Sequence, residues 1–558
     1  MAITRRTFVE GAVAAAATTG VVASAALADA PEIPEGPVEI DWVGTEPETP
    51  AEFAQELEAD VIVVGLGWAG VCATRSACEA GASVIVFEKG EKYGLLRQNV
   101  NAWGSKLYTE WYPECEQFWD KGLAMNGVMQ GCLNRNSDAI QSKWFDINGE
   151  VFDWFFKAID GLDISIGTSE NPKVDTSKLN VCETSYPFPK NYNPAEEYYP
   201  CFPGCAKISP SPEPIFDKCL EMGAEANGGN LEILRYTPVI KLIKEDGRIT
   251  GVIAQNADGE YIKAIAHNGV VLATGDFFSN KLMVNAFLSR RYPDGCKTLN
   301  TLKDINGNPC NMGDGHRMGV WAGAKVQLDG VNMSHTIGGR SRLMGTLPTL
   351  FLDVRGKRFM NEDVQGQQFA ERIWELKDFL AYQIFDAGLF DHMDDMPYGH
   401  GKHPEVTLEQ VTADAEAGNL FYSDTLEGLL EQLDLDQEAA LASIEHYNEL
   451  CHNGVDTDYG KVAKRMIPVE KPPFFCDRYL GDGSNNFVGH LVTMSGLESD
   501  EECHVYDTDM DIIPGLYACG NVQGNRFAVI YPEVLQGHSI AMAMTFGYLA
   551  GKNAAEGK

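Results

Sequence analysis

The chain has 558 residues, of which 44 are lysine or arginine and 80 are aspartate or glutamate, so its formal charge is −36. Hydrophobic residues make up 44% and are spread along its whole length, which predicts two or more folded domains and argues against wholesale disorder. A surface this acidic is repelled by nucleic acid and by anionic lipid, so neither is expected as a partner.

The first 28 residues have the layout of an export signal. Arg5 and Arg6 precede a weakly apolar run over 11–28, which ends in a small-residue cleavage site. Adjacent arginines are typical of the twin-arginine route, so we expect the mature protein in the cell envelope or periplasm. A membrane anchor is the alternative, but the run is marginal for spanning and we expect no membrane insertion of the mature chain. Residues 29–57, rich in proline and acidic residues, predict an extended and poorly packed linker.

Residues 59–88 predict a dinucleotide-binding unit. A β-branched strand, a glycine-rich turn, a helix, a second strand and an acidic residue follow one another in the expected order. These features are the strand 59–64, the G-x-G-x-x-G motif 65–70, the helix 71–80, the strand 83–87 and Glu88. A structural turn without a ligand is the alternative, but the complete set within 30 residues favours a dinucleotide.

The motif needs small residues for three separate reasons. Gly65 permits a tight turn, Gly67 lets the backbone approach a pyrophosphate, and Gly70 lets the helix pack on the strand. The helix N-terminus then faces the anion, and Glu88 is placed for a ribose hydroxyl. The cofactor contacts expected here are Gly65, Gly67, Trp68, Ala69, Gly70, Glu88 and Lys89.

Later segments favour FAD over NAD. A strand over 231–239 and a hairpin of 251–254 and 261–264 precede a strand over 269–275, which resembles the second nucleotide-proximal strand of two-dinucleotide-fold flavoproteins. Residues 513–521 resemble the segment that closes over the flavin ribityl chain in the same proteins. The further cofactor contacts expected from these segments are Val239, Ala273, Thr274, Gly275, Gly520 and Asn521.

Cysteine and histidine spacing predicts no metal site. Fourteen cysteines are scattered along the chain, the one close pair is Cys201 and Cys205, and the eleven histidines show no ligand pattern. This number of cysteines is compatible with an iron–sulfur cluster or with disulfides, but the spacing predicts neither. We expect mostly buried thiols.

These segments together resemble the fumarate reductase/succinate dehydrogenase flavoprotein superfamily, in the branch with urocanate reductase, 3-ketosteroid dehydrogenases and cardiac glycoside reductase. Further matching motifs lie at 313–318, 356–362, 472–474, 493–497 and 543–550. The resemblance implies an α/β fold, with a doubly wound, glutathione-reductase-like FAD-binding domain of two dinucleotide folds and an inserted α+β capping domain. It places the FAD-binding domain at 58–333 and 492–558 and the capping domain at 334–491.

The resemblance also implies cofactor contacts at Asp314, Ser539 and Ile540. Ser539 and Ile540, with His538, fall at a helix N-terminus beside the flavin pyrimidine carbonyl, where negative charge on the reduced flavin would be stabilised.

Fumarate reductases bind a C4 dicarboxylate with two arginines and two histidines, and one arginine donates the proton. Here the donor position falls on Gly366, and the second arginine is replaced in the stretch with Tyr531, where Arg526 is out of register. One histidine position falls on Leu491, next to His490. His335 is the one match. Without both arginines a dicarboxylate would keep unpaired charge, so fumarate is not the expected substrate.

The resemblance therefore implies an FAD-dependent reductase of an activated C=C bond in an enone or acrylate-type small molecule. Hydride would come from FAD N5 and a proton from Tyr531, with His335 and His490 as further candidates. The alternatives for these three are a core tyrosine and two satisfied polar histidines. Gln365, Gln367 and Arg340 are expected to bind substrate, although Arg340 is equally compatible with a solvated position.

No second dinucleotide motif is present, so electrons are expected from an external membrane-linked or envelope carrier. One alternative is a 3-ketosteroid-type dehydrogenase working in the oxidative direction. Another is a non-catalytic flavin subunit that relays electrons.

Overall fold

The computed structural model describes most of the chain from residue 41 onward. The described residues are 41–94, 98–112, 120–167, 174–175, 177–184, 190–193, 202, 204–288, 302–328, 330, 332–336, 339–364, 366–397, 405–481 and 488–558. The predicted export signal, residues 29–40 of the predicted linker, and Gln365 lie outside them.

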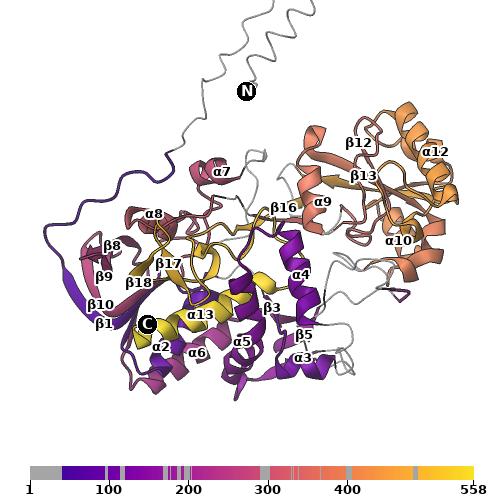
Figure 1. The fold of residues 1–558 in the computed structure, drawn as a ribbon. Helices are drawn as coiled ribbons and strands as arrows, with labels where there is room; N and C mark the ends of the chain where they lie inside the picture. The colour runs from indigo at the N-terminus through magenta and orange to yellow at the C-terminus, as the bar shows by residue number, and fades with distance from the viewer. Residues whose placement is uncertain are drawn as a thin grey trace, which may run out of the picture. The chain divides into compact units, whose positions relative to one another are not determined.

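A largely parallel sheet forms the centre of the FAD-binding region (Figure 1). Its main path runs β17-β18-β10-β1-β2-β7, and only β17 is antiparallel to its neighbour on this path. The strands are β1 (Gln55–Val64), β2 (Val84–Phe87), β7 (Leu231–Leu234), β10 (Tyr261–Leu272), β17 (His504–Tyr506) and β18 (Ile512–Ala518). The strand β9 (Arg248–Gln255) pairs antiparallel with β10, and β8 (Val239–Glu245) pairs antiparallel with β9.

The apolar run of β1 fixes this sheet in the interior because both of its faces are covered. Val61 and Val63 belong to the core on one face, whereas Ile62 and Val64 belong to the core on the other. Helices α2 (Trp68–Glu79) and α13 (His538–Glu556) pack against each other on the first face. They are joined there by α5 (Asp138–Phe156) and α6 (Glu213–Ala226), as Figure 1 shows. The second face carries β8, β9 and α8 (Asp314–Trp321).

Two predicted strand boundaries differ from the structure, whereas the predicted hairpin is present as the pairing of β9 with the start of β10. The expected hairpin strand 261–264 and the expected strand 269–275 are one strand, β10, because the residues between them continue its pairing with β1 past an irregularity at Ala59. The expected strand 231–239 is instead divided between β7 and the start of β8. Tyr236 has a φ of 53° and is followed by Thr237 and Pro238, so the chain turns between the two strands.

The described part of the predicted linker, residues 41–54, is mostly exposed and contacts the rest of the structure at a few points. Trp42 packs edge-on against Phe287, with ring centroids 4.9 Å apart. Lys241 forms an ion pair with Glu46 at 3.0 Å and donates a hydrogen bond to the carbonyl of Pro47. One tryptophan and one partly exposed lysine thus hold the segment against the domain at these points.

A second region contains an antiparallel sheet of order β12-β13-β15-β14 within the residues assigned to the capping domain. Its strands are β12 (Leu350–Asp353), β13 (Leu380–Asp386), β14 (Phe421–Ser423) and β15 (Phe474–Leu480). Helices α11 (Leu426–Leu430) and α12 (Gln437–Asn453) share one core with this sheet, and α10 (Leu408–Glu416) shares another. The antiparallel pair β11 (Asn332–Thr336) and β16 (Val488–Thr493) lies in sequence on either side of this region. The helix α9 (Gly366–Ile373) packs against β11.

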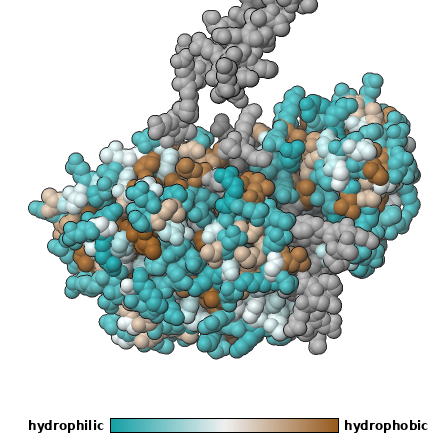
Figure 2. All heavy atoms as spheres, in the orientation of Figure 1, coloured by the Kyte–Doolittle hydropathy of each residue, from teal (hydrophilic) through white to brown (hydrophobic). Residues whose placement is uncertain are grey.

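The segment between β2 and β7 supplies a further small sheet of order β3-β6-β5-β4. The strands of this sheet are β3 (Asn99–Asn101), β4 (Ile164–Ile166), β5 (Leu179–Glu183) and β6 (Cys205–Ser209). The same segment contains the helices α3 (Lys106–Trp111) and α4 (Lys121–Gly131). After β10 comes α7 (Lys281–Phe287). Hydrophilic side chains cover most of the face drawn in Figure 2, in keeping with the acidic composition.

Candidate functional site

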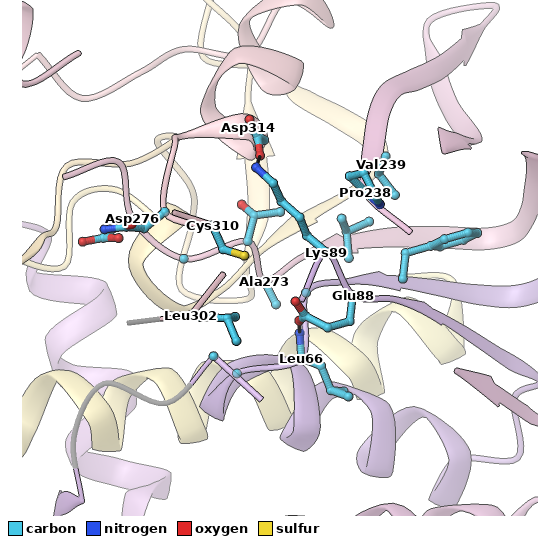
Figure 3. A pocket seen from close by; sticks show the side chains of 18 of the residues that line it. Leu66, Glu88, Lys89, Pro238, Val239, Ala273, Asp276, Leu302, Cys310 and Asp314 are labelled. Carbon is cyan, nitrogen blue, oxygen red and sulfur yellow. Dashed lines mark hydrogen bonds and ion pairs between the residues drawn. The ribbon is translucent and has the colours of Figure 1, made fainter. Parts of the chain in front are cut away.

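A pocket lies at the carboxyl ends of the parallel strands β1, β2 and β10 (Figure 3). Gly65 and Leu66 follow β1, Glu88 follows β2, and Ala273 and Thr274 follow β10. The carboxyl edge of a doubly wound sheet is where nucleotides bind, because loops diverge there and leave a crevice.

The glycines of the first turn have no room for side chains. A Cβ on Gly65, whose φ is 97°, would lie 2.5 Å from the carbonyl oxygen of Ala273. A Cβ on Gly70 would lie 2.0 Å from the carbonyl oxygen of Gly65. The turn is therefore held directly against β10. Helix α2 begins after Gly67 with no side-chain cap and no acidic residue in its first turn, so its N-terminus is suited to an anion.

Glu88 is fixed in the pocket wall by backbone donors. Its carboxylate accepts hydrogen bonds of 2.7 Å from the N–H groups of Leu66 and Gly90. Burial raises the pKa of Glu88, and these two hydrogen bonds oppose that rise by stabilising the charged form. The first bond joins the glycine-rich turn after β1 to the end of β2, so the acid predicted for the ribose also braces the turn (Figure 3).

The opposite wall contains buried polar atoms that have no partner among the described residues. They are Thr274 Oγ1, Asp276 Oδ1 and Asn311 Nδ2. The other oxygen of Asp276 accepts a hydrogen bond from the Thr493 N–H at 3.1 Å, and burial raises the pKa of Asp276 to about 7. Orphaned donors and acceptors in a pocket wall are expected where a polar ligand binds. The donor set thus fits a nucleotide with hydroxyl and phosphate groups.

The structure gathers about half of the predicted cofactor contacts into this pocket. Those that line it are Gly65, Gly67, Glu88, Lys89, Val239, Ala273, Thr274, Gly275 and Asp314. Lys89 and Asp314 form an ion pair at 2.8 Å across it, as Figure 3 shows. Those that do not line it are Trp68, Ala69, Gly70, Gly520, Asn521, Ser539 and Ile540.

Two of these outlying residues nevertheless contact each other. A Cβ on Gly520 would lie 3.1 Å from the Cβ of Ala69, so the C-terminal segment lies against the first turn of α2.

Sequence reasoning missed several lining residues. Asp276 directly follows the Ala273-Thr274-Gly275 sequence after β10, so this motif could have indicated its position. Leu302, Cys310 and Asn311 come from a segment without a motif and could not have been found from spacing.

Tyr531 lies in the C-terminal segment, just before α13. Its side chain is 4% exposed, and its ring packs edge-on against Phe527 at 4.9 Å. Its hydroxyl lies 3.4 Å from both the Leu535 carbonyl and the Ser539 N–H, which donates to it. Tyr531 is therefore anchored to the first turn of α13, the helix that the family resemblance implies beside the flavin.

The other candidate substrate residues lie on neighbouring elements. His335 is on β11 and His490 on β16, where the register pairs Ser334 with His490. Gln367 is on α9, which packs against β11; its side chain is buried and its Oε1 has no partner among the described residues. Arg340 is exposed.

Within the described ranges, no group of three or more His, Cys, Asp or Glu side chains is arranged to hold a metal ion. The cysteines that the structure describes are free thiols and most of them are buried. None of the helices in the described part of the chain has the length and apolarity needed to span a membrane.

Comparison with known proteins identifies the family. The family model of the FAD binding domain matches residues 216–533, more than half of the chain. The vinyl phenol reductase of Lactiplantibacillus plantarum is 27% identical, over 89% of this chain and 96% of the relative. The digoxin reductase of Eggerthella lenta is also 27% identical, over 91% of this chain and 88% of the relative.

Solved structures share the fold. The 3-ketosteroid-Δ4-(5α)-dehydrogenase of Rhodococcus jostii superposes with a TM-score of 0.65 at 20% identity, over 91% of this chain and 98% of that one. The predicted α/β fold class and the predicted cofactor are thus confirmed. The chain belongs to the fumarate reductase/succinate dehydrogenase family of FAD-binding flavoproteins, and it is an FAD-dependent oxidoreductase acting on C=C bonds.

Proposed function

We propose that this protein reduces the activated C=C bond of an enone or acrylate-type compound and that fumarate is not its substrate. The names of the two relatives above support the reductive direction, because both are reductases of unsaturated compounds. The observation that carries the exclusion of fumarate is the residue at the start of α9, Gly366, where the family resemblance expects the proton-donating arginine.

A glycine at this position can neither donate a proton nor bind a carboxylate. The next residue, Gln367, is 2% exposed and offers a neutral amide whose oxygen has no described partner. An amide suits a hydroxyl or a carbonyl, whereas a second substrate carboxylate would stay unpaired in a buried site at a cost of several kcal/mol. Gln367 is therefore proposed to bind the substrate.

Tyr531 is proposed as the proton donor. FAD supplies the hydride from its N5 atom when it is bound. The hydroxyl of Tyr531 accepts from the Ser539 N–H and donates to the Leu535 carbonyl, so the phenol is held in one orientation, and its proton would pass from this long hydrogen bond to the substrate. Its burial keeps bulk water from competing for that proton. His335 and His490 remain the alternative donors on the β11–β16 pair.

We also propose that electrons reach FAD from a separate membrane-linked or envelope carrier, and that the twin-arginine signal exports the protein. A single dinucleotide motif supports the first proposal, and the layout of residues 1–28 supports the second.

The function is tested under anaerobic conditions with the purified protein. FAD is reduced with a stoichiometric amount of dithionite, and the flavin absorbance is followed after adding one enone, one acrylate or fumarate. We expect rapid reoxidation by an enone or an acrylate and none by fumarate. Equal or faster reoxidation by fumarate would contradict the proposal.

Two further outcomes decide between the alternatives. Bleaching of the oxidised flavin by a 3-ketosteroid, without reoxidation by any unsaturated carbonyl, would establish the dehydrogenase direction. Reducible FAD that no small molecule reoxidises, but that exchanges electrons with an envelope carrier, would establish the electron relay.

A further inference from the structure

Arg526 is a buried cation without a counter-ion. Its side chain has no exposed surface, and none of the carboxylates that the structure describes forms an ion pair with it. Its Nε donates to the Gln523 carbonyl at 3.2 Å and its Nη2 to Asn521 Oδ1 at 2.9 Å, while Nη1 has no partner among the described residues. Burial lowers the pKa of Arg526 to about 10, so the guanidinium is still charged at neutral pH.

The other deeply buried arginines are neutralised by the protein itself. Arg75 is 1% exposed and pairs with Glu79 at 2.8 Å. Arg465 is also 1% exposed and pairs with Asp363 at 2.6 Å. An isolated buried charge is costly, so a cation kept without a carboxylate indicates that its anionic partner is a bound molecule.

The side chains around Arg526 are short of partners too. His538 is fully buried, and neither of its ring nitrogens has a described partner. Burial and the charge of Arg526 lower the pKa of His538 to about 3, so this histidine is neutral. Trp144 lies against it with ring centroids 4.2 Å apart, and its Nε1 is likewise unpartnered. Several unpaired buried donors and acceptors in one place are typical of a ligand site.

The elements around this cluster belong to the FAD-binding region and not to the capping region. Asn521, which holds Arg526, follows Gly520, and Gly520 contacts the first turn of α2 through Ala69. His538 begins α13, which packs on α2. Gln141 on α5 holds the Arg526 carbonyl. None of the described contacts of Arg526 involves the β12–β15 sheet of the capping region.

We propose that Arg526 is the buried cation that stabilises the negative charge of reduced FAD, with Asn521 and Gln523 orienting its guanidinium and neutral His538 hydrogen-bonding to the same ring. Oxidised FAD has an uncharged ring, and uptake of two electrons and one proton leaves one negative charge on it. A fixed cation therefore favours the reduced form. The inference rests on FAD binding and is independent of the substrate class proposed above.

The test compares R526M, R526K and the control variant R75M, which removes a buried arginine that has its own carboxylate. The midpoint potential of bound FAD is measured by anaerobic spectroelectrochemical titration without any substrate. We expect R526M to shift the equilibrium at least about tenfold toward oxidised FAD, which lowers a two-electron potential by about 30 mV for each factor of ten. R526K, which keeps the charge, and R75M should stay within about threefold of the wild type.

A potential in R526M equal to that of the wild type would overturn the inference. A shift in R526K as large as the shift in R526M would overturn it too.

The wild-type protein supplies a second measurement in case R526M does not retain FAD. If reduced FAD is held as the anion, two electrons are taken up with one proton, and the midpoint potential falls by about 30 mV for each unit of pH increase even at about pH 5.5. A slope of about 59 mV per pH unit means that a second proton binds.

The titratable side chains that face Arg526 are Cys519, Tyr531 and His538. The pKa of the Cys519 thiol is raised to about 12 by burial, so neither Cys519 nor His538 titrates at this pH. A slope of about 59 mV in the wild type would therefore refute the inference.

Discussion

Replacing Tyr531 by phenylalanine separates its catalytic role from its structural one. The change keeps the ring, and hence the edge-on contact with Phe527 at 4.9 Å, and removes only the hydroxyl. Two of the hydrogen bonds that the hydroxyl makes are long, at 3.4 Å to the Ser539 N–H and to the Leu535 carbonyl. Hydrogen bonds contribute about 0.5–1.5 kcal/mol to stability, so we expect Y531F to lose about 1 kcal/mol of unfolding free energy at most.

The expected effect on catalysis is much larger. A positioned general acid contributes about 10²–10⁴ in rate, which corresponds to about 3–5 kcal/mol of transition-state stabilisation. The assay is anaerobic stopped-flow: dithionite-reduced protein is mixed with an enone or acrylate substrate and the return of the flavin band is timed. Dithionite reduction itself needs no proton from Tyr531, so its rate should be unchanged.

A matched control is Y382F in the capping sheet. Tyr382 is 1% exposed and its hydroxyl donates to the Asp434 carbonyl at 2.8 Å, so this variant loses comparable stability without a catalytic loss. Reoxidation of Y531F within about threefold of the wild type would refute Tyr531 as the acid, because a general acid contributes far more than this. The histidines of β11 and β16 would then be examined as H335N and H490N.

Three further predictions concern cofactor binding and stability. In G70A the new Cβ would meet the Gly65 carbonyl at 2.0 Å, so the turn must move, and the ratio of flavin to protein absorbance should fall at least about tenfold. Folding raises the pKa of the Asp276 carboxyl from 3.8 to about 7, so the wild-type protein loses stability as the pH rises through that interval. D276N lacks this carboxyl, so its unfolding free energy relative to the wild type should increase by up to about 4 kcal/mol between about pH 4 and 7 and stay constant above that. Urea unfolding of the apoprotein measures this difference. R358M removes the cation paired with Glu362 at 2.8 Å in the buried ion network of the capping region, so we expect a loss of about 3–5 kcal/mol in thermal unfolding with little change in activity per folded molecule.

The sequence was most informative where a single chain segment makes a complete structural unit. The turn from Gly65 to Gly70 was predictable because its glycines are needed for steric reasons, and for Gly65 and Gly70 the structure shows the close contacts, with Ala273 and with Gly65. The acid at the end of β2 was predictable from the same unit. Helix α2 begins at Trp68, three residues before the predicted start, because the glycine turn already leads into helical backbone.

Contacts between distant segments could not be predicted from the sequence. Asn311 and Asp276 lie in one pocket wall because of tertiary folding, and no spacing pattern indicates this. Trp42 shows the same limit, since a proline-rich and acidic stretch gives no hint that one ring will find Phe287. Arg526 does not match the register of the family's carboxylate-binding arginine, so the sequence alone indicates no role for it. Its burial without a counter-ion is what makes it a candidate for a different role.

The central claim is that this site lacks the charged groups that a dicarboxylate needs while retaining those that reduce a C=C bond. The most direct measurement compares fumarate with dimethyl fumarate as oxidants of the dithionite-reduced protein, since the two share the same double bond and differ in charge. Free reduced FAD serves as the control for reaction outside the site. The account predicts that the diester reoxidises the protein faster than it reoxidises free FAD and that fumarate is inert. Reoxidation by fumarate as fast as by its diester would contradict it.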